Sequence, residues 1–182
     1  ADIVCGSLKT PAPPPPVGHE LRYAYEKAAD KRRSTSYRRT HPYECFTTFN
    51  VMMNRKVFEK VMFDERCTEY GYEDALLGLM LERENFSIFH SDNALIHGGI
   101  DCSTSFIEKT EAALRTLHHI GEPMQSYTGT SRTARKLEKL KIKKTAAQLF
   151  LLFRDRLYGQ LTGRHPSVFL FQLYKLGYYC TL

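Results

Sequence analysis

Closely paired cysteines are absent from this 182-residue sequence, and their absence removes two classes of small protein. The five cysteines (Cys5, Cys45, Cys67, Cys102 and Cys180) are scattered and include no CxxC pair. Zinc ribbons need such pairs, and disulfide-stapled folds need a denser cysteine framework. We expect neither here, and reduced thiols in a cytoplasmic protein fit the pattern best.

Long apolar runs are missing as well. The first residues, ADIVCGSL, lack the basic region and the long apolar core of a secretory signal, so we expect a buried strand at Ile3 to Cys5. The apolar stretches near the other end are interrupted by charged residues at 154–156 and 175, which makes them too short and too charged to span a bilayer. Because the chain begins with what looks like a core strand, we expect it to be part of a longer protein.

What the sequence does contain is a globular composition with a local excess of positive charge. Hydrophobic residues make up 42% and charged residues 25%, which excludes overall disorder. The net charge of +6 is concentrated at 31–39 and at 132–144. Such stretches form solvated helix faces, or they meet the phosphates of nucleotides, nucleic acids or lipid headgroups, and charge alone does not choose between these partners.

Strand-like and helix-like segments alternate over the first 120 residues. The apolar and β-branched runs that predict strands are 3–5, 45–53, 86–91 and 94–97. Helical spacing is found at 19–33, in a short helix capped by Asn54, at 73–84 and at 101–120. This order predicts an α/β fold.

A change of composition follows residue 120. Residues 121–131 are typical of a linker, and 132–182 combine a basic amphipathic stretch with an apolar, aromatic end. We therefore predict a first domain at 1–120, a linker at 121–131 and a helical extension at 132–182. That extension is either a soluble surface helix or a helix held at an anionic membrane surface.

Two adjacent carboxylates, Glu73 and Asp74, open an otherwise apolar helical run in YGYEDALLGLML. Carboxylates in a first helical turn are favoured by the helix dipole, which explains many such pairs. Gly71 and Tyr72 come just before them and can form a pocket wall from which a carboxylate projects. A general base needs that kind of shielded placement, so these four residues are also candidates for a catalytic or substrate-binding site.

The longer stretch FTTFNVMMNRKVFEKVMFDERCTEYGYEDALLGLML, followed by FSIFHS and DNALIH, resembles the second half of a family 2 glycosyltransferase with a GT-A fold. The resemblance runs from ADIVCG to about Ile120 and is strongest to bacterial enzymes that build cell-envelope polysaccharides or lipid-linked glycans. It implies a partial GT-A, Rossmann-like domain with a mixed sheet, followed by the helical extension.

The resemblance also implies roles for particular residues. Asp74 becomes the base that deprotonates the acceptor hydroxyl, with Glu73 beside it. Phe49 and Asn50 lie on the floor of the donor and acceptor cleft. His97 matches a position at which some of these enzymes bind a divalent metal, although a lone histidine at a strand end is often a structural residue. We expect Asp74 to matter for catalysis rather than for folding.

The expected partners follow from the same resemblance: a nucleotide-sugar donor, a glycan or lipid-linked acceptor, and Mg²⁺ or Mn²⁺ at the diphosphate. The nucleotide-binding strands and the DxD metal motif of the family do not occur in these residues. The implied location is the cytoplasm or the inner face of the plasma membrane. Two alternatives stay open, a membrane-associated scaffold and a basic nucleic-acid-binding module, although no nucleic-acid-binding signature is visible.

Overall fold

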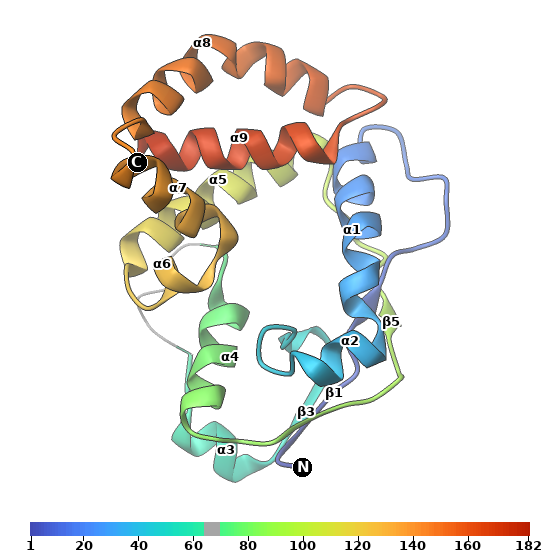
Figure 1. Cartoon of the computed structure of the whole chain (residues 1–182). Coiled ribbons are helices and arrows are strands. Elements are labelled where there is room, and N and C mark those ends of the chain that lie inside the picture. Colours follow the sequence, from blue (N-terminus) through green and yellow to red (C-terminus); the bar gives the residue numbers. More distant parts are fainter. Residues whose placement is uncertain (64–69) are drawn as a thin grey trace. The chain divides into compact units, whose positions relative to one another are not determined.

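The computed structural model describes residues 1–63 and 70–182, and it has an α/β fold with small sheets and many helices (Figure 1). The stretch 64–69, which contains Cys67 and most of the FDERCTEY segment, lies outside the described residues. The described residues form two compact units. Unit 1 contains 1–14, 26–63 and 72–100, and unit 2 contains 15–25, 70–71 and 101–182.

Unit 1 is built on a three-stranded mixed sheet in the order β3-β1-β4. The predicted strand β1 (Ile3–Cys5) pairs antiparallel with β3 (Val51–Met53) and parallel with β4 (Ile88–His90). A second pair, β2 (Leu8–Lys9) and β5 (Leu95–Ile96), is parallel. The last residue of β1, Cys5, lies opposite both Val51 and His90.

This register brings three chain segments to one edge of the sheet. The residues that follow β1 and β4 meet there, and so do the residues that precede the antiparallel strand β3. We call this the carboxyl edge and define it by the segments 6–7, 47–50 and 91–93. In open α/β sheets, ligands usually bind beyond the carboxyl ends of the strands.

The core of unit 1 packs one face of the sheet against α3 (Arg55–Lys60) and α4 (Glu73–Arg83). Its buried members are Ile3, Phe46, Val57, Val61, Leu77 and Leu81. Asn54 caps α3 as the sequence predicts, because its side chain accepts a hydrogen bond from the backbone N–H of Lys56. The apolar spacing of α4 places Leu77 and Leu81 one turn apart on its buried face.

Unit 2 is helical. It contains α5 (Ser103–Ile120), α6 (Met124–Tyr127), α7 (Gly129–Lys139), α8 (Lys143–Leu161) and α9 (Val168–Thr181), together with the first turns of α1 (Glu20–Arg33). Its core comprises Leu21, Phe106, Ile107, Phe150, Leu161, Phe171 and Tyr174. The helix α9 packs on α5, α7 and α8, with α8 lying along it (Figure 1).

The structure differs from the sequence prediction in three segments. The division predicted at residue 120 is not the observed one, because α5 packs with α9 in unit 2. The predicted linker 121–131 contains α6 and the start of α7, where Thr128 caps the helix by accepting from the N–H of Ser131. The predicted strand 45–53 is mostly a turn, η1 (Thr48–Asn50), followed by the short β3.

No helix within 1–63 and 70–182 is long and apolar enough to cross a membrane.

Candidate functional site

The carboxyl edge is held together by the side-chain amide of Asn50. Its Nδ2 donates to the carbonyl of Ser7 at 3.2 Å and to that of Asn93 at 2.6 Å. The backbone N–H of Gly6 donates to the carbonyl of Asn50 at 2.8 Å. A Cβ on Gly6 would overlap the Asn50 amide, so the three segments meet closely only because residue 6 is glycine. Asn50 therefore lies at the carboxyl edge and fixes its backbone.

The buried guanidinium of Arg38 forms hydrogen bonds with the backbone at the same edge. Arg38, in α2 (Thr35–Thr40), is 1% exposed and donates to the carbonyls of Cys5 at 3.1 Å and Ser91 at 2.8 Å. Its Nη1 also donates to Nδ1 of the fully buried His90 at 2.9 Å. These bonds tie together the chain as it leaves β1 and β4, and so set the positions of the two loops at the edge.

His90 is neutral in this arrangement. Because Nδ1 accepts from Arg38, the proton is on Nε2, which donates to the carbonyl of Pro42 at 3.0 Å. Burial lowers the pKa of His90, while the hydrogen bond to Pro42 opposes that shift and the nearby Arg38 adds to it. The structure gives His90 a structural position.

Asp74 is fixed by the segment that precedes η1. Its Oδ2 accepts from the Thr47 hydroxyl at 3.0 Å and from the Thr48 backbone N–H at 3.2 Å, and its Oδ1 accepts from the Thr48 hydroxyl at 2.7 Å. The carboxylate therefore ties α4 to the carboxyl edge. This differs from the expectation that Asp74 has little to do with folding, because hydrogen bonds to a charged group each contribute about 1.5 to 3 kcal/mol.

The Asp74 carboxylate retains one open acceptor position among the described residues. A carboxylate has about four lone-pair sites, two on each oxygen. Both sites on Oδ2 are used and one site on Oδ1 is used, which leaves Oδ1 able to accept one further hydrogen bond. The three donors from Thr47 and Thr48 thus orient a half-buried carboxylate without saturating it.

Phe49 and His97 are in contact, and Phe49 directly follows Thr48, which binds the Asp74 carboxylate. Their rings meet edge to face with centroids 5.1 Å apart, and the backbone N–H of His97 donates to the carbonyl of Lys9 at 3.1 Å. Phe49 is 42% exposed, so it presents an aromatic surface at the edge. The Nδ1 atom of His97 is buried and has no hydrogen-bond partner among the described residues.

Among the residues that the structure describes, the side chains around His97 do not form a complete ligand set for a divalent metal. An orphaned imidazole nitrogen fits one metal ligand, which makes His97 a chemically reasonable single contributor. Within the described part of the chain, however, no three histidine, cysteine, aspartate or glutamate side chains gather as a ligand group. Magnesium and manganese sites use several oxygen ligands, so His97 by itself is not a metal centre.

The residues just before Asp74 have separate local roles. Tyr72 takes a left-handed conformation with φ of 69° and precedes the first residue of α4, Glu73. Gly71 has φ of 109° and lies against Ala113 of α5 in unit 2, where a Cβ would overlap that alanine. Glycine at 71 is thus required for the close approach to α5, and its substrate-binding role stays a prediction.

Comparison of this chain with protein-family models, with curated proteins and with solved structures found no match.

The structure brings Asp74, Phe49, Asn50 and His97 to one side of unit 1 and adds two residues that the sequence did not single out as functional. One is Thr48, whose side chain and backbone both bind Asp74. The other is Arg38, which lies in a polar, basic stretch that looks solvated. The two adjacent threonines of FTTFN were a sequence signal for the role of Thr48, because threonine hydroxyls can hold a carboxylate. The basic run around Arg38 gives no sign that its side chain is buried.

Proposed function

We propose that the carboxyl edge of unit 1 is the acceptor side of a glycosyltransferase site, within a GT-A fold of the family 2 type. The observation that carries this proposal is the held but unsaturated carboxylate of Asp74 beside the exposed ring of Phe49. A sugar ring presents hydroxyl groups at its rim and C–H groups on its faces, which are the two chemistries that a carboxylate and an aromatic ring can bind.

The reaction follows from the open position on Asp74. An acceptor hydroxyl donates a hydrogen bond to Oδ1. As the hydroxyl oxygen attacks the anomeric carbon of a nucleotide sugar, its proton passes to the carboxylate. The bond between the anomeric carbon and the diphosphate breaks, and the nucleoside diphosphate leaves with the electron pair. Glu73, as the neighbouring residue in the first turn of α4, is proposed to help orient the acceptor.

Thr47 and Thr48 keep the base in place during this step. Three donors fix the plane of the Asp74 carboxylate, so the open Oδ1 position points in one direction rather than several. Holding a reacting group in one orientation lowers the entropic part of the barrier. Mg²⁺ or Mn²⁺ belongs to the proposed class of enzyme, with His97 as one candidate ligand, and no step described here depends on it.

The proposal concerns the acceptor side of the site. The DxD motif and the nucleotide-binding strands of the class have no counterpart in these 182 residues. The nucleotide-sugar donor, the glycan or lipid-linked acceptor, and action at the inner face of the plasma membrane are part of the same proposal. The supporting evidence for them is the resemblance of FTTFN, YGYED and DNALIH to the family, together with the gathering of these segments at one edge.

The test is transfer by the full-length protein with Asp74→Asn. A panel of nucleotide sugars and oligosaccharide acceptors is screened for release of nucleoside diphosphate. Loss of a general base typically costs 10² to 10⁴ in rate, so we expect a fall of at least about 100-fold. Asn54→Ala is the matched control, because it removes a helix cap in the same unit, worth about 1 kcal/mol, away from the edge.

Full transfer by Asp74→Asn would rule out this role. An equal loss in Asp74→Asn and Asn54→Ala would show that the first variant acts only through stability. A large loss in Asp74→Asn supports the proposed base if circular dichroism shows that this variant is folded under the assay conditions and if Asn54→Ala retains transfer.

A further inference from the structure

The helix α8 is apolar on two opposite sides. On its inner side, Phe150 and Leu161 are buried in the core of unit 2, and the partly buried Leu157 packs against that core. On its outer side, the run LFLLF leaves four large apolar side chains exposed: Leu149, Leu151, Leu152 and Phe153. Leu152 is the extreme case, with 73% of its surface exposed. Adjacent exposed apolar side chains of this size are typical of an interaction surface.

Helical spacing places part of this run on one stripe. Leu149, Leu152 and Arg156 are related by three and four residues and lie on the same side of the helix. Of these, Leu152 points most nearly away from the core residue Phe150. Leu151 lies to one flank of that stripe and Phe153 to the other. We call these four exposed side chains, residues 149 and 151–153, the α8 outer face.

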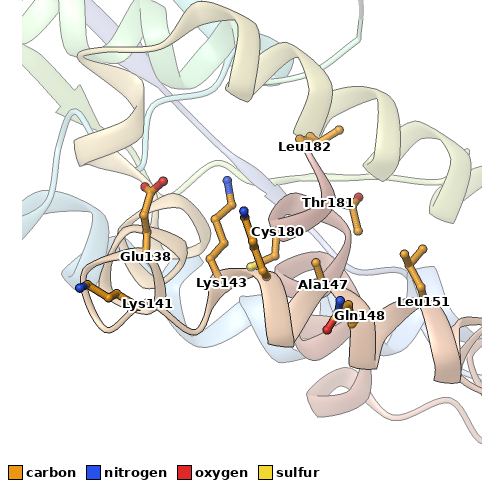
Figure 2. A pocket seen from close by; sticks show the side chains of 10 residues that line it. Glu138, Lys141, Lys143, Ala147, Gln148, Leu151, Cys180, Thr181 and Leu182 are labelled. Atoms are coloured by element: carbon orange, nitrogen blue, oxygen red, sulfur yellow. The ribbon is translucent and has the colours of Figure 1, made fainter.

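Lysines border the α8 outer face at the start of the helix. Lys141, Lys143 and Lys144 line a cavity of about 730 Å³ together with Glu138, Ala147, Gln148, Leu151, Cys180, Thr181 and Leu182 (Figure 2). Within the residues that the structure describes, none of these three lysines forms an ion pair. Leu151 belongs both to the cavity wall and to the outer face, so cationic and apolar groups are continuous.

The positive charge of residues 132–182 favours an anionic partner over a second copy of the chain. Residues 132–182 contain eleven Lys and Arg but only two Asp and Glu, a net charge of +9. A second copy of the chain would place this charge against an identical charge, which opposes self-association. An anionic bilayer offers the complementary arrangement, with phosphates at the surface and apolar chains just beneath.

We propose that the α8 outer face binds an anionic membrane surface, with the leucines entering the interface between headgroups and acyl chains. Lys141, Lys143 and Lys144 contact lipid phosphates, and the cavity they line accommodates a headgroup beside Leu151. The helix lies along the membrane rather than across it. This inference is independent of the proposed glycosyltransferase activity, since it uses only residues of unit 2.

The test is cosedimentation of the full chain with two kinds of vesicle. One is phosphatidylcholine alone, and the other is phosphatidylcholine with about 30% phosphatidylglycerol, which makes the surface anionic. We expect binding to the second vesicles and much weaker binding to the first. Leu149→Gln with Leu152→Gln should weaken binding by about 10-fold or more, because two apolar side chains no longer enter the interface. The triple variant Lys141→Gln, Lys143→Gln, Lys144→Gln should weaken it by roughly 100-fold.

A matched control comes from unit 1. Met52 is 70% exposed, close to the value for Leu152, and lies outside the basic segment. Met52→Gln should bind anionic vesicles as well as the unaltered chain does. Circular dichroism of every variant shows whether α8 remains folded. We expect it to do so, because the substituted side chains are exposed or, for Lys143, half-buried.

Three results would overturn the proposal. One is failure of the folded chain to bind anionic vesicles. Another is vesicle binding that survives the double leucine substitution unchanged. The third is a chain that dimerises in sedimentation equilibrium, or binds duplex DNA in preference to vesicles, through the same leucines. Salt-sensitive vesicle binding lost on either set of substitutions supports it.

Discussion

The carboxyl edge of unit 1 and the α8 outer face of unit 2 differ in how their side chains are satisfied. At the edge, the polar groups of Asn50, Arg38 and Asp74 have hydrogen-bond partners in other segments of the same unit. On α8, four large apolar side chains have no cover. An ordered polar edge suits recognition of one small molecule in one orientation, whereas an exposed apolar stripe suits a broad surface.

The two parts of the sequence also differ in net charge. Residues 1–131 contain 15 Lys and Arg against 18 Asp and Glu, a net charge of −3, whereas residues 132–182 carry +9. The overall value of +6 conceals this separation. Net charge describes association with charged partners only when it is assigned to the part of the chain that carries it.

The largest effect is expected from removing the buried guanidinium that supports the edge. Arg38→Met leaves the carbonyl of Ser91 and the Nδ1 of His90 without their donor. The carbonyl of Cys5 loses one of two donors, because it also accepts from the backbone N–H of Ser91. A buried acceptor left without a partner costs about 1 to 3 kcal/mol, so the two orphaned acceptors together should cost about 2 to 6 kcal/mol. Urea denaturation followed by circular dichroism measures the free energy of unfolding.

The neighbouring arginine supplies the control for that prediction. Arg39 is exposed, donates one hydrogen bond to the carbonyl of His90 and lies over the ring of Phe89 at 5.3 Å. Arg39→Met should cost no more than about 1 kcal/mol. Equal effects of the two substitutions would show that the edge does not depend on the buried arginine.

A smaller effect concerns pH and the histidine beside Arg38. Burial lowers the pKa of His90 below its ordinary value of 6.5, so the folded protein binds this proton less readily than the unfolded chain does. The contribution of neutral His90 to stability is present above pH 6.5 and is lost as the pH falls below it. The free energy of unfolding should therefore decrease on acidification from pH 7.5 toward about 5.

His90→Asn isolates this contribution. Asparagine cannot titrate, yet its side-chain oxygen can accept from Arg38 in place of Nδ1. The variant should show a weaker pH dependence of the unfolding free energy over the same range. Identical pH dependence in the two proteins would mean that other groups account for the acid sensitivity.

The smallest effect concerns the thiols of the two units. Cys102, next to the first residue of α5, has its pKa lowered to about 7, chiefly by a hydrogen bond with the Thr104 hydroxyl at 3.2 Å. Burial raises the pKa of Cys45 in unit 1. Alkylation by iodoacetamide at pH 7, followed by mass spectrometry, should modify Cys102 about 10-fold faster than Cys45.

Thr104→Val tests the cause of that difference, since it removes the hydroxyl and should slow the alkylation of Cys102. Unchanged reactivity would assign the lowered pKa to the other groups near the thiol, such as Ser105.

The sequence predicted the regular elements well where local chemistry decides them. The helix start at Glu73, the cap at Asn54 and the strand at Ile3–Cys5 are all confirmed. Each depends on signals within a few residues: acids in a first turn, a capping side chain, and an apolar run ended by glycine.

The segments that sequence reasoning missed depend on distant partners. The sequence around Arg38 does not show that its side chain is buried, because the acceptors that hold it inside unit 1 include carbonyls on β1 and after β4. The run CFTTFNVMM has strand-forming residues, yet the Thr47 hydroxyl accepts from the N–H of Phe49 and Asp74 binds Thr48, which turns the chain at η1. In the 121–131 segment, linker-like composition conceals the cap at Thr128.

Transfer to a water-soluble acceptor, compared between Asp74→Asn and the Leu149→Gln, Leu152→Gln double variant, tests most directly whether the two regions have separate functions. The account predicts a loss of at least about 100-fold in the first variant and unchanged transfer in the second. Retained transfer in Asp74→Asn, or an equal loss in both variants, would contradict it.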